Sequence, residues 1–245
     1  ATAVALYYSD NAGYADTYGA INTWDTSGIT DMSGLFLGRT GQSLPISSWN
    51  VSNVTDMSGM FRNSDMNVDI RGWNVSNVTN MSGMFQGNTT LTDQNATYLN
   101  EWNVGNVTNM SFMFKETNLG ANVNLNNWNT SKVTNMDRMF AGATSFNGEI
   151  GNWNVSEVTN MDRMFKHCAS FNKDITNWNT SKVTTMKGMF YGNTNFNQNI
   201  NTDGDKWNVD SVTDMSGMFY KATAFAPTSL NNWDVGKVTD MTDMF

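Results

Sequence analysis

Few side chains in this 245-residue chain could carry chemistry, and two of those few are adjacent. His167 and Cys168 are the one histidine and the one cysteine of the chain. A Cys–His pair can act as nucleophile and base when a third group orients the base. Adjacent side chains point in different directions, however, and the sequence fixes no third partner. We therefore expect Cys168 to be a buried small residue and predict no catalytic residue.

Methionine sulfur is a second candidate ligand, because the spacing Met-x-x-Met occurs eight times. Soft thioether ligands can hold Cu(I). Each pair is followed directly by a phenylalanine, which is typical of the inward face of one helical turn. We therefore predict that the methionines pack in a core and bind no metal.

Carboxylates offer a third kind of site. Asp203, Asp205 and Asp210 lie close together in the sequence, and carboxylate oxygens are the ligands that Ca²⁺ prefers. Their spacing does not match the D-x-D-x-D-G loop of a calcium-binding hand. They stay weak candidates for a structural Ca²⁺ ion, and no other cofactor is predicted.

The composition excludes several classes of protein. A formal net charge of −8 argues against a nucleic-acid partner, because such binding needs basic surface. No run approaches the ~18 apolar residues of a membrane span, so we expect no membrane insertion. One cysteine cannot build an internal disulfide framework, and 12% aromatic residues are too many for a disordered chain.

A single repeated unit positions all of these residues. Each of the nine tryptophans is followed 12 residues later by a phenylalanine, and 17 of the 18 methionines lie between the two. The units begin at Trp24, Trp49, Trp73, Trp102, Trp128, Trp153, Trp178, Trp207 and Trp233. We predict one domain of nine repeats over 24–245, the last incomplete, and an N-terminal cap or donated strand over 1–23.

The fifth unit indicates how one coil should fold. Met136, Met139 and Phe140 have the i, i+3, i+4 spacing of one helical turn, and the asparagine before them suits an N-cap. The stretches 129–134 and 146–150 could stack on neighbouring coils as parallel strands ~4.8 Å apart. We therefore expect an α/β solenoid like that of leucine-rich repeats, with short parallel β-strands and one short helical turn per coil.

Stacking would bring identical residues of successive coils into columns. Methionine fills irregular gaps beside aromatic rings, so Trp, Met and Phe should form the core. The core residues predicted from the second and fifth units are Trp49, Met57, Met60, Phe61, Trp128, Met136, Met139 and Phe140.

The unit W-N-V-S-N-V-T-D-M-S-G-M-F at residues 49–61, with F-N-x-x-I in its second half, resembles a known family. It is similar to the BspA-like repeats of bacterial surface proteins and lipoproteins, which are distant relatives of leucine-rich repeats. Cys168, in H-C-A-S-F-N, lies where that family often has cysteine. The resemblance covers 24–245 and implies an extracellular or cell-surface protein with roles in adhesion or host contact. It transfers no catalytic residue.

The two ends suggest a way to assemble. Ala20–Trp24 matches the end of a repeat, whereas the last unit stops after its Met-x-x-Met-Phe block. One interpretation is a fragment with an N-terminal cap. The other is head-to-tail assembly with copies of itself, in which 1–23 of one subunit completes the open coil of the next. The candidate contact residues are Val4, Leu6, Tyr8, Ile21, Met241, Met244 and Phe245.

Two functions therefore compete, and neither involves catalysis. In an adhesion or protein-contact module, one face or the long linkers should carry charged or aromatic anchors that are specific to certain coils. Lys132, Lys182 and Lys237 against Glu157, all at one repeat position, show such variation. In a filament or surface-layer subunit, specificity should lie at the ends. In a secreted eukaryotic chain, Asn88 and Asn95 would be possible glycan acceptors.

Ice binding is a minor alternative. A threonine lies two positions before the first methionine of every unit, and flat threonine arrays bind ice. The spacing T-x-M places it between two core residues, so we expect a hydrogen-bonded internal ladder. Ice binding would require an outward column beside another column of short side chains. The column is Thr30, Thr55, Thr79, Thr108, Thr134, Thr159, Thr184, Thr213 and Thr239.

Overall fold

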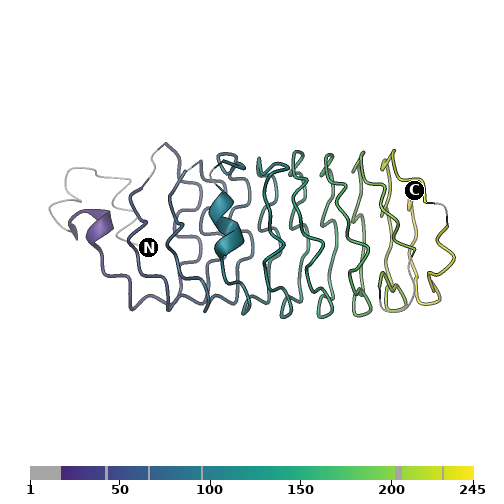
Figure 1. Ribbon diagram of the computed structural model, residues 1–245, viewed down its shortest axis with the longest axis horizontal. Helices are drawn as coiled ribbons and strands as arrows, with labels where there is room; N and C mark the ends of the chain where they lie inside the picture. Colours follow the sequence, from purple (N-terminus) through teal and green to yellow (C-terminus); the bar gives the residue numbers. More distant parts are fainter. Residues whose placement is uncertain (1–17, 42–43, 66, 95, 202–205, 228) are drawn as a thin grey trace.

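Successive coils, one per repeat, stack side by side along a single long axis (Figure 1). The computed structural model describes residues 18–41, 44–65, 67–94, 96–201, 206–227 and 229–245. Within these ranges the helices are two short 3₁₀ helices, η1 (Ile21–Thr23) and η2 (Thr97–Glu101), and no strand forms. Most of each coil consists of turns and loops.

The predicted leucine-rich-repeat-like α/β solenoid is therefore wrong. Neighbouring coils are joined by isolated parallel bridges such as Asn135↔Asn160, one residue wide, and the stretches 129–134 and 146–150 form no sheet. The Met-x-x-Met-Phe segment forms no helical turn either. The cause of both errors is the backbone conformation of that segment.

In the Met-x-x-Met-Phe segment, every second N–H donates to the next coil. The N–H groups of Met32, Gly34 and Phe36 donate to carbonyls of the second coil, at 2.8–2.9 Å. The N–H between two of these closes a tight turn, as from Leu35 to the carbonyl of Met32 at 3.3 Å. The pattern uses the backbone groups that a helix would need for its own hydrogen bonds.

A left-handed residue lies at the third position of each such segment. Gly59 and Arg138, for example, have φ of 59° and 52°. A right-handed helix cannot include such a residue. The nine residues at this position are Gly34, Gly59, Gly83, Phe112, Arg138, Arg163, Gly188, Gly217 and Asp243.

The predicted N-cap residues instead support these turns. The Asn135 Oδ1 accepts a hydrogen bond from the Asp137 N–H at 2.9 Å, and Asp56 Oδ1 accepts from the Ser58 N–H at 2.7 Å. Both are side-chain-to-backbone turns in which Asn and Asp are favoured. The same residue types thus serve a different local structure.

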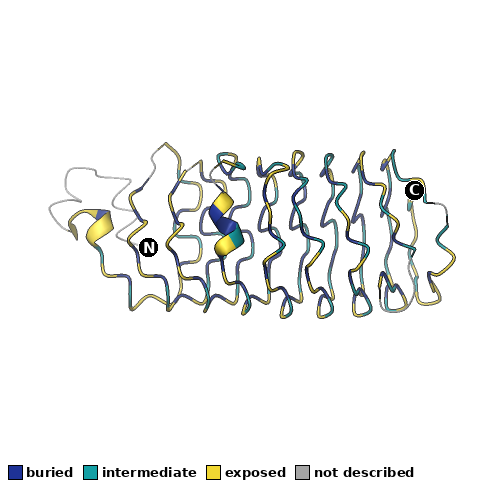
Figure 2. Cartoon of the chain, in the orientation of Figure 1, coloured by how far each residue is buried: buried dark blue, intermediate teal, exposed yellow. Residues whose placement is uncertain are grey.

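The core consists of aromatic and methionine columns that run the length of the stack. Buried segments recur along the whole stack (Figure 2). Phenylalanine rings of successive coils stack at 5.4–5.9 Å between centroids, as Phe114 does on Phe140 at 5.6 Å. The structure buries all eight residues that represent the predicted core, none more than 4% exposed. They are Trp49, Met57, Met60, Phe61, Trp128, Met136, Met139 and Phe140.

Apart from Trp102, the tryptophans from Trp49 onward also join each coil to the one before it through a hydrogen bond. The Nε1–H of Trp153 donates to the carbonyl of Leu125 at 2.9 Å, and that of Trp49 donates to Ile21 at 2.8 Å. The Nε1–H of Trp102 is buried without a partner. Trp102 directly follows η2. This helix ends the linker 86–101, which is longer than the linkers of the neighbouring coils.

Replacement of tryptophan by phenylalanine should reveal the value of this hydrogen bond. Both Trp153→Phe and Trp102→Phe shrink a buried ring, but only the first removes a hydrogen bond. We expect Trp153→Phe to lower the free energy of unfolding by about 0.5–1.5 kcal/mol more than Trp102→Phe does. Urea denaturation of the two variants measures the difference, and equal losses would contradict the assignment.

A glycine pair tests the left-handed turn. A Cβ at Gly59 meets nothing closer than 3.9 Å, so its φ of 59° is the only obstacle to alanine. We expect Gly59→Ala to cost roughly 1–2 kcal/mol. Gly72 has similar space and no positive φ, so Gly72→Ala serves as the matched control and should be neutral or slightly stabilising. The same denaturation measurement applies.

Candidate binding groove

One face of the stack, here called the groove face, is formed by the second and third residues of each Met-x-x-Met-Phe segment and the two residues after its phenylalanine. In every coil but the last, the methionines and the final phenylalanine of the same segments are buried in the core. Three hollows lie along it and share lining residues: Phe112 borders the first and second, and Arg163 and Lys166 border the second and third. The three hollows therefore adjoin one another along this face, and together they are called the groove. The surface residues of the groove face lie within 33–38, 58–63, 82–87, 111–116, 137–142, 162–167, 187–192, 216–221 and 242–243.

The lining changes along the groove. Small residues line much of the first hollow, among them Ser58, Gly59, Ser82 and Gly83. The second hollow, here called the cationic hollow, encloses about 490 Å³ between the fourth, fifth and sixth coils. Its charged lining residues are Lys115, Glu116, Arg138, Arg163 and Lys166, with His167 beside them.

Positive charge is in excess in the cationic hollow. Lys115 pairs with Glu116 at 2.9 Å, and Arg138 pairs with Asp137 at 2.6 Å. Within the described part of the chain, no carboxylate lies within ion-pair distance of Arg163 or Lys166. A chain with a net charge of −8 thus concentrates unneutralised positive charge at one place.

The pKa values of two groups in the hollow are lowered, first by burial and then by the neighbouring positive charges. Burial lowers the pKa of Lys166, and the cations Arg163, Arg138 and Lys115 lower it further. Burial also lowers the pKa of His167, with additional effects from Lys166 and Lys221. Each added proton is resisted by like charges, so a bound anion would be favoured here.

Aromatic rings lie beside these cations. The guanidinium of Arg138 lies 5.3 Å from the centre of the Phe112 ring, and Lys166 Nζ lies 4.7 Å from that of Tyr191. Tyr191 also contacts Tyr220, at 5.0 Å between ring centres. Cation–π attraction holds the charges in place, since it restricts long side chains that would otherwise be mobile.

The third hollow is closer to neutral. Asp240 and Asp243 line it together with Arg163, Lys166 and Lys187. Lys187 also lies 3.5 Å from Asp214. The cationic hollow is therefore the part of the groove with the strongest preference for an anion.

The floor of the groove offers little free backbone. The N–H of Gly188 donates to Ser216 and that of Gly217 donates to Thr242, both at 2.8 Å. Because these bonds join one coil to the next, a ligand must be recognised by side chains.

Sequence reasoning missed the groove, although a signal was present. The columns behind Met and Phe repeat faithfully, whereas the outward positions change from Ser and Gly in early coils to Asp, Arg and Lys later. Positions that depart from an otherwise faithful repeat mark a surface that the fold alone does not constrain.

The structure separates His167 from Cys168. Cys168 is fully buried, its Sγ–H donates to the carbonyl of Ala143 at 3.1 Å, and burial raises the pKa of its thiol far above the ordinary value. His167 lies at the surface on the groove face. The two side chains do not converge on one site.

The calcium candidates are only partly described. Asp203 and Asp205 lie outside the described residues, and Asp210 is exposed, with Oδ2 accepting a hydrogen bond from Asn208 Nδ2 at 3.2 Å. Among the described residues, no group of three or more His, Cys, Asp or Glu could hold a metal ion.

The two predicted glycan acceptors are Asn88 and Asn95. Asn88 is only 2% exposed, and its Oδ1 accepts hydrogen bonds from the N–H groups of Thr90 and Leu91. A glycan at Asn88 would have no room in this fold, so that interpretation is wrong. Asn95 lies outside the described residues.

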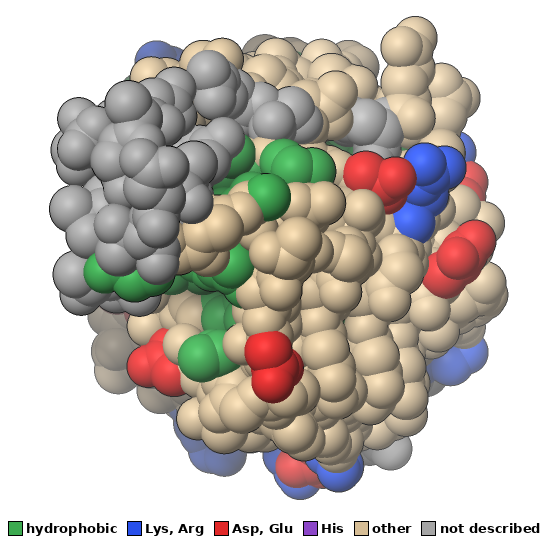
Figure 3. Space-filling model, turned by 90° about the vertical axis from the view of Figure 1, so that its left-hand side faces the viewer, with side chains coloured by type: hydrophobic (Ala, Val, Ile, Leu, Met, Phe, Trp, Pro, Cys, Tyr) green, Lys and Arg blue, Asp and Glu red, His purple; other side chains and the backbone are tan. Residues whose placement is uncertain are grey.

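The assembly candidates lie at the two ends of the stack. Ile21 is buried, and Figure 3 shows hydrophobic side chains gathered on the end at which it lies. At the other end Met241 is 41% and Phe245 68% exposed, while Met244 is half-buried. The Phe245 ring continues the phenylalanine column, 5.7 Å from that of Phe219. Val4, Leu6 and Tyr8 lie outside the described residues, so head-to-tail assembly stays a prediction.

The threonine column faces outward, contrary to the predicted internal ladder. Every one of its nine members is exposed. Each hydroxyl after the first donates to the backbone carbonyl of the preceding threonine, as Thr55 does to Thr30 at 3.2 Å. The ladder is therefore formed at the surface, because each threonine precedes the residue that bridges two coils.

The residues two positions before the threonines form another column, most of it exposed, and side chains of neighbouring coils pair within it. Lys182 Nζ lies 2.7 Å from Glu157 Oε1, and Lys132 Nζ donates to Asn106 Oδ1 at 2.7 Å. Exposed pairs of this kind contribute little to stability. These long charged side chains also interrupt the uniform surface that ice binding requires.

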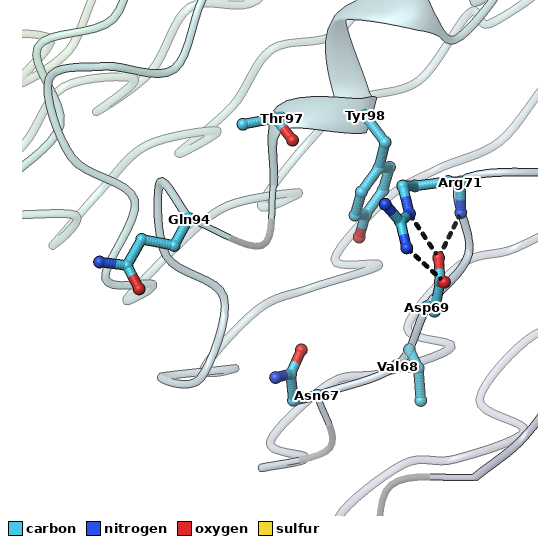
Figure 4. A pocket seen from close by; sticks show the side chains of 7 residues that line it. All are labelled: Asn67, Val68, Asp69, Arg71, Gln94, Thr97 and Tyr98. Atoms are coloured by element: carbon cyan, nitrogen blue, oxygen red, sulfur yellow. Dashed lines mark hydrogen bonds and ion pairs between the residues drawn. The ribbon is translucent and has the colours of Figure 1, made fainter.

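A separate hollow lies beside η2 (Figure 4). Asp69 and Arg71 face each other there at 2.8 Å, and the guanidinium lowers the pKa of Asp69 to about 2. The ring of Tyr98 points toward the same space, and burial raises the pKa of its hydroxyl. Because its two charges neutralise each other, this hollow has a weaker preference for a charged ligand than the cationic hollow has.

No helix in the described ranges is both long and apolar enough to cross a membrane. A family model described as "Mycoplasma protein of unknown function, DUF285" matches residues 8–123, 113–204 and 200–245. The chain matches no curated protein and no solved structure.

The single histidine reports on the cationic hollow. We expect NMR titration to give His167 a pKa below 6.5, so that it is neutral at pH 7. Because the folded pKa lies below the unfolded one, acidification below about pH 6.5 should lower the free energy of unfolding. Lys166→Ala should raise the pKa of His167, and Lys132→Asn, on another face, should leave it unchanged. A wild-type pKa at or above 6.5 would contradict the description.

Proposed function

The chain belongs to the repeat family described as Mycoplasma protein of unknown function, DUF285, and we propose that it is a non-catalytic binding module that contacts a partner through the groove face. The proposal assigns no catalytic residue. Its partner is a macromolecule or surface long enough to span several coils.

The observation that carries the proposal is the coil-specific lining of the groove. Charged and aromatic side chains gather at the fourth to eighth coils, whereas the first three coils present mainly Ser and Gly at the corresponding positions. Structural repetition would require no such difference. Anchors limited to part of a surface are typical of binding sites, where few residues supply most of the affinity.

The location follows from the resemblance of the repeat unit at 49–61 to BspA-like surface proteins. We propose that the chain lies outside the cell or on its surface and acts in adhesion. Long stacks of coils suit this role, because they hold a binding face away from the point of attachment.

Two double variants provide the test, and each uses residues that the chain itself has at equivalent positions. The double variant Arg163→Gly with Lys166→Ala removes two charges from the groove. Its new residues are those found at the equivalent positions of other coils, Gly188 and Ala141. The double variant Lys132→Asn with Lys182→Asn removes two charges from another face. Asparagine is the residue that the fourth coil has at this position, Asn106. The change in net charge is the same, so only position differs.

Binding of the labelled protein to cell surfaces and to matrix-coated plates is the measurement. We expect the groove variant to bind about 10-fold more weakly or worse, because charge-assisted contacts are each about 1.5–3 kcal/mol. The control variant should bind like the wild type. Equal loss in both variants would indicate a non-specific charge effect and contradict the proposal.

A further inference from the structure

We propose that the groove binds an acidic polysaccharide, with a carboxylate or sulfate group of the sugar chain in the cationic hollow. The inference rests on the proposed function and names the chemistry of its partner. Its starting point is the pair Arg163 and Lys166, which lack a carboxylate partner among the described residues.

The amount of positive charge limits the choice of ligand. Four cations line the cationic hollow, against Glu116 within it and Asp137 at its edge. The adjoining third hollow contains carboxylates, and the chain as a whole is acidic. A nucleic acid, with a phosphate at every residue, would meet the carboxylates of the third hollow on one side of the cationic hollow, and on the other side it would find only Arg62 as a cation. A polymer whose anionic groups are spaced apart fits one cationic hollow between less charged stretches.

The aromatic rings beside the cations favour a sugar as the ligand. Phe112 and Tyr191 are half-buried and each has a cation over its ring, so apolar surface and positive charge lie side by side. An acidic sugar presents the matching combination, a C–H face beside a carboxylate or sulfate. An arginine such as Arg163 can also bind such an oxyanion with two parallel hydrogen bonds.

The shape and the polar lining support an extended chain. The three hollows adjoin one another along one face, so a polymer can lie along several coils. Serine hydroxyls line the groove on either side of the cationic hollow. Those of Ser58 and Ser82 can hydrogen-bond to sugar hydroxyls, and that of Ser216, which donates to Asp214 Oδ1 at 2.6 Å, can accept a hydrogen bond from one.

An acidic peptide fits less well. Peptides that bind in extended form usually add a strand to an exposed sheet edge. The groove floor provides no such edge, since the N–H groups of Gly188 and Gly217 already donate to the next coil. An acidic peptide would retain only its charge as a means of recognition.

The experiment compares probes that separate charge from sugar. Hyaluronate carries one carboxylate, and κ-carrageenan one sulfate, on every second sugar. Methyl-esterified hyaluronate and agarose provide similar sugar chains without charge, and polyglutamate retains the charge without sugar. We expect binding of one or both acidic polysaccharides, none of the neutral ones, and at least 10-fold weaker binding of polyglutamate at equal charge. Which acidic polysaccharide binds identifies the anionic group.

Variants then locate the site. Arg163→Gly with Lys166→Ala should weaken polysaccharide binding at least 10-fold, and Lys132→Asn with Lys182→Asn should not. Alanine occurs at the position of Tyr191 in the fifth coil, as Ala141. The variant Tyr191→Ala should weaken binding of the polysaccharide and leave binding of polyglutamate unchanged. The bound polysaccharide should also raise the pKa of His167, because its anion offsets the charge of Lys166.

The outcomes separate this inference from the proposed function. Polyglutamate or a single-stranded oligonucleotide binding as tightly as the polysaccharides would overturn the ligand class, as would an unaffected groove variant. If that variant loses surface adhesion while neither acidic polysaccharide binds, the groove is the binding face and its ligand is of another class. If adhesion too is unaffected, the proposed function itself fails.

Discussion

The structure depends on hydrogen bonds between the backbones of successive coils. In the Met-x-x-Met-Phe segment, alternate N–H groups donate to the next coil, as Met136 does to Asn160 and Phe140 to Met164. These bonds hold equivalent residues of neighbouring coils opposite one another, so the aromatic columns and the Trp indole contacts follow from them. Each coil has too few local contacts to be stable alone, and stacking supplies the remainder.

The same backbone shapes the outer surface. Because the Met-x-x-Met-Phe segment turns rather than coils into a helix, its second and third positions face outward on one side. Small residues there, such as Ser82 and Gly83, leave a shallow groove in the early coils. Larger residues at the same positions, such as Arg138 and Arg163, line the cationic hollow without disturbing the core. The fold can therefore vary its groove while its interior repeats.

Two lysines of the chain show that the surroundings of a charge decide whether it favours a bound anion. Lys182 is exposed and paired with Glu157, and its column connects neighbouring coils. Lys166 is partly buried, surrounded by cations and placed over Tyr191. The two residues have the same side chain, yet only the second lies where a bound anion would relieve repulsion.

The sequence by itself determined the repeat, its boundaries and the residues inside it. Trp, Met and Phe recur at fixed spacing because burial selects the same residue at the same point of every coil, and Trp128 and Met136 are indeed buried. Only the tertiary structure decided the conformation of the coil. Bonds between residues about 25 positions apart replaced the local bonds that the helical spacing predicts, and local patterns do not report such competition. For the same reason, only stacking turned Thr134 outward and brought Lys115, Arg138 and Arg163 together.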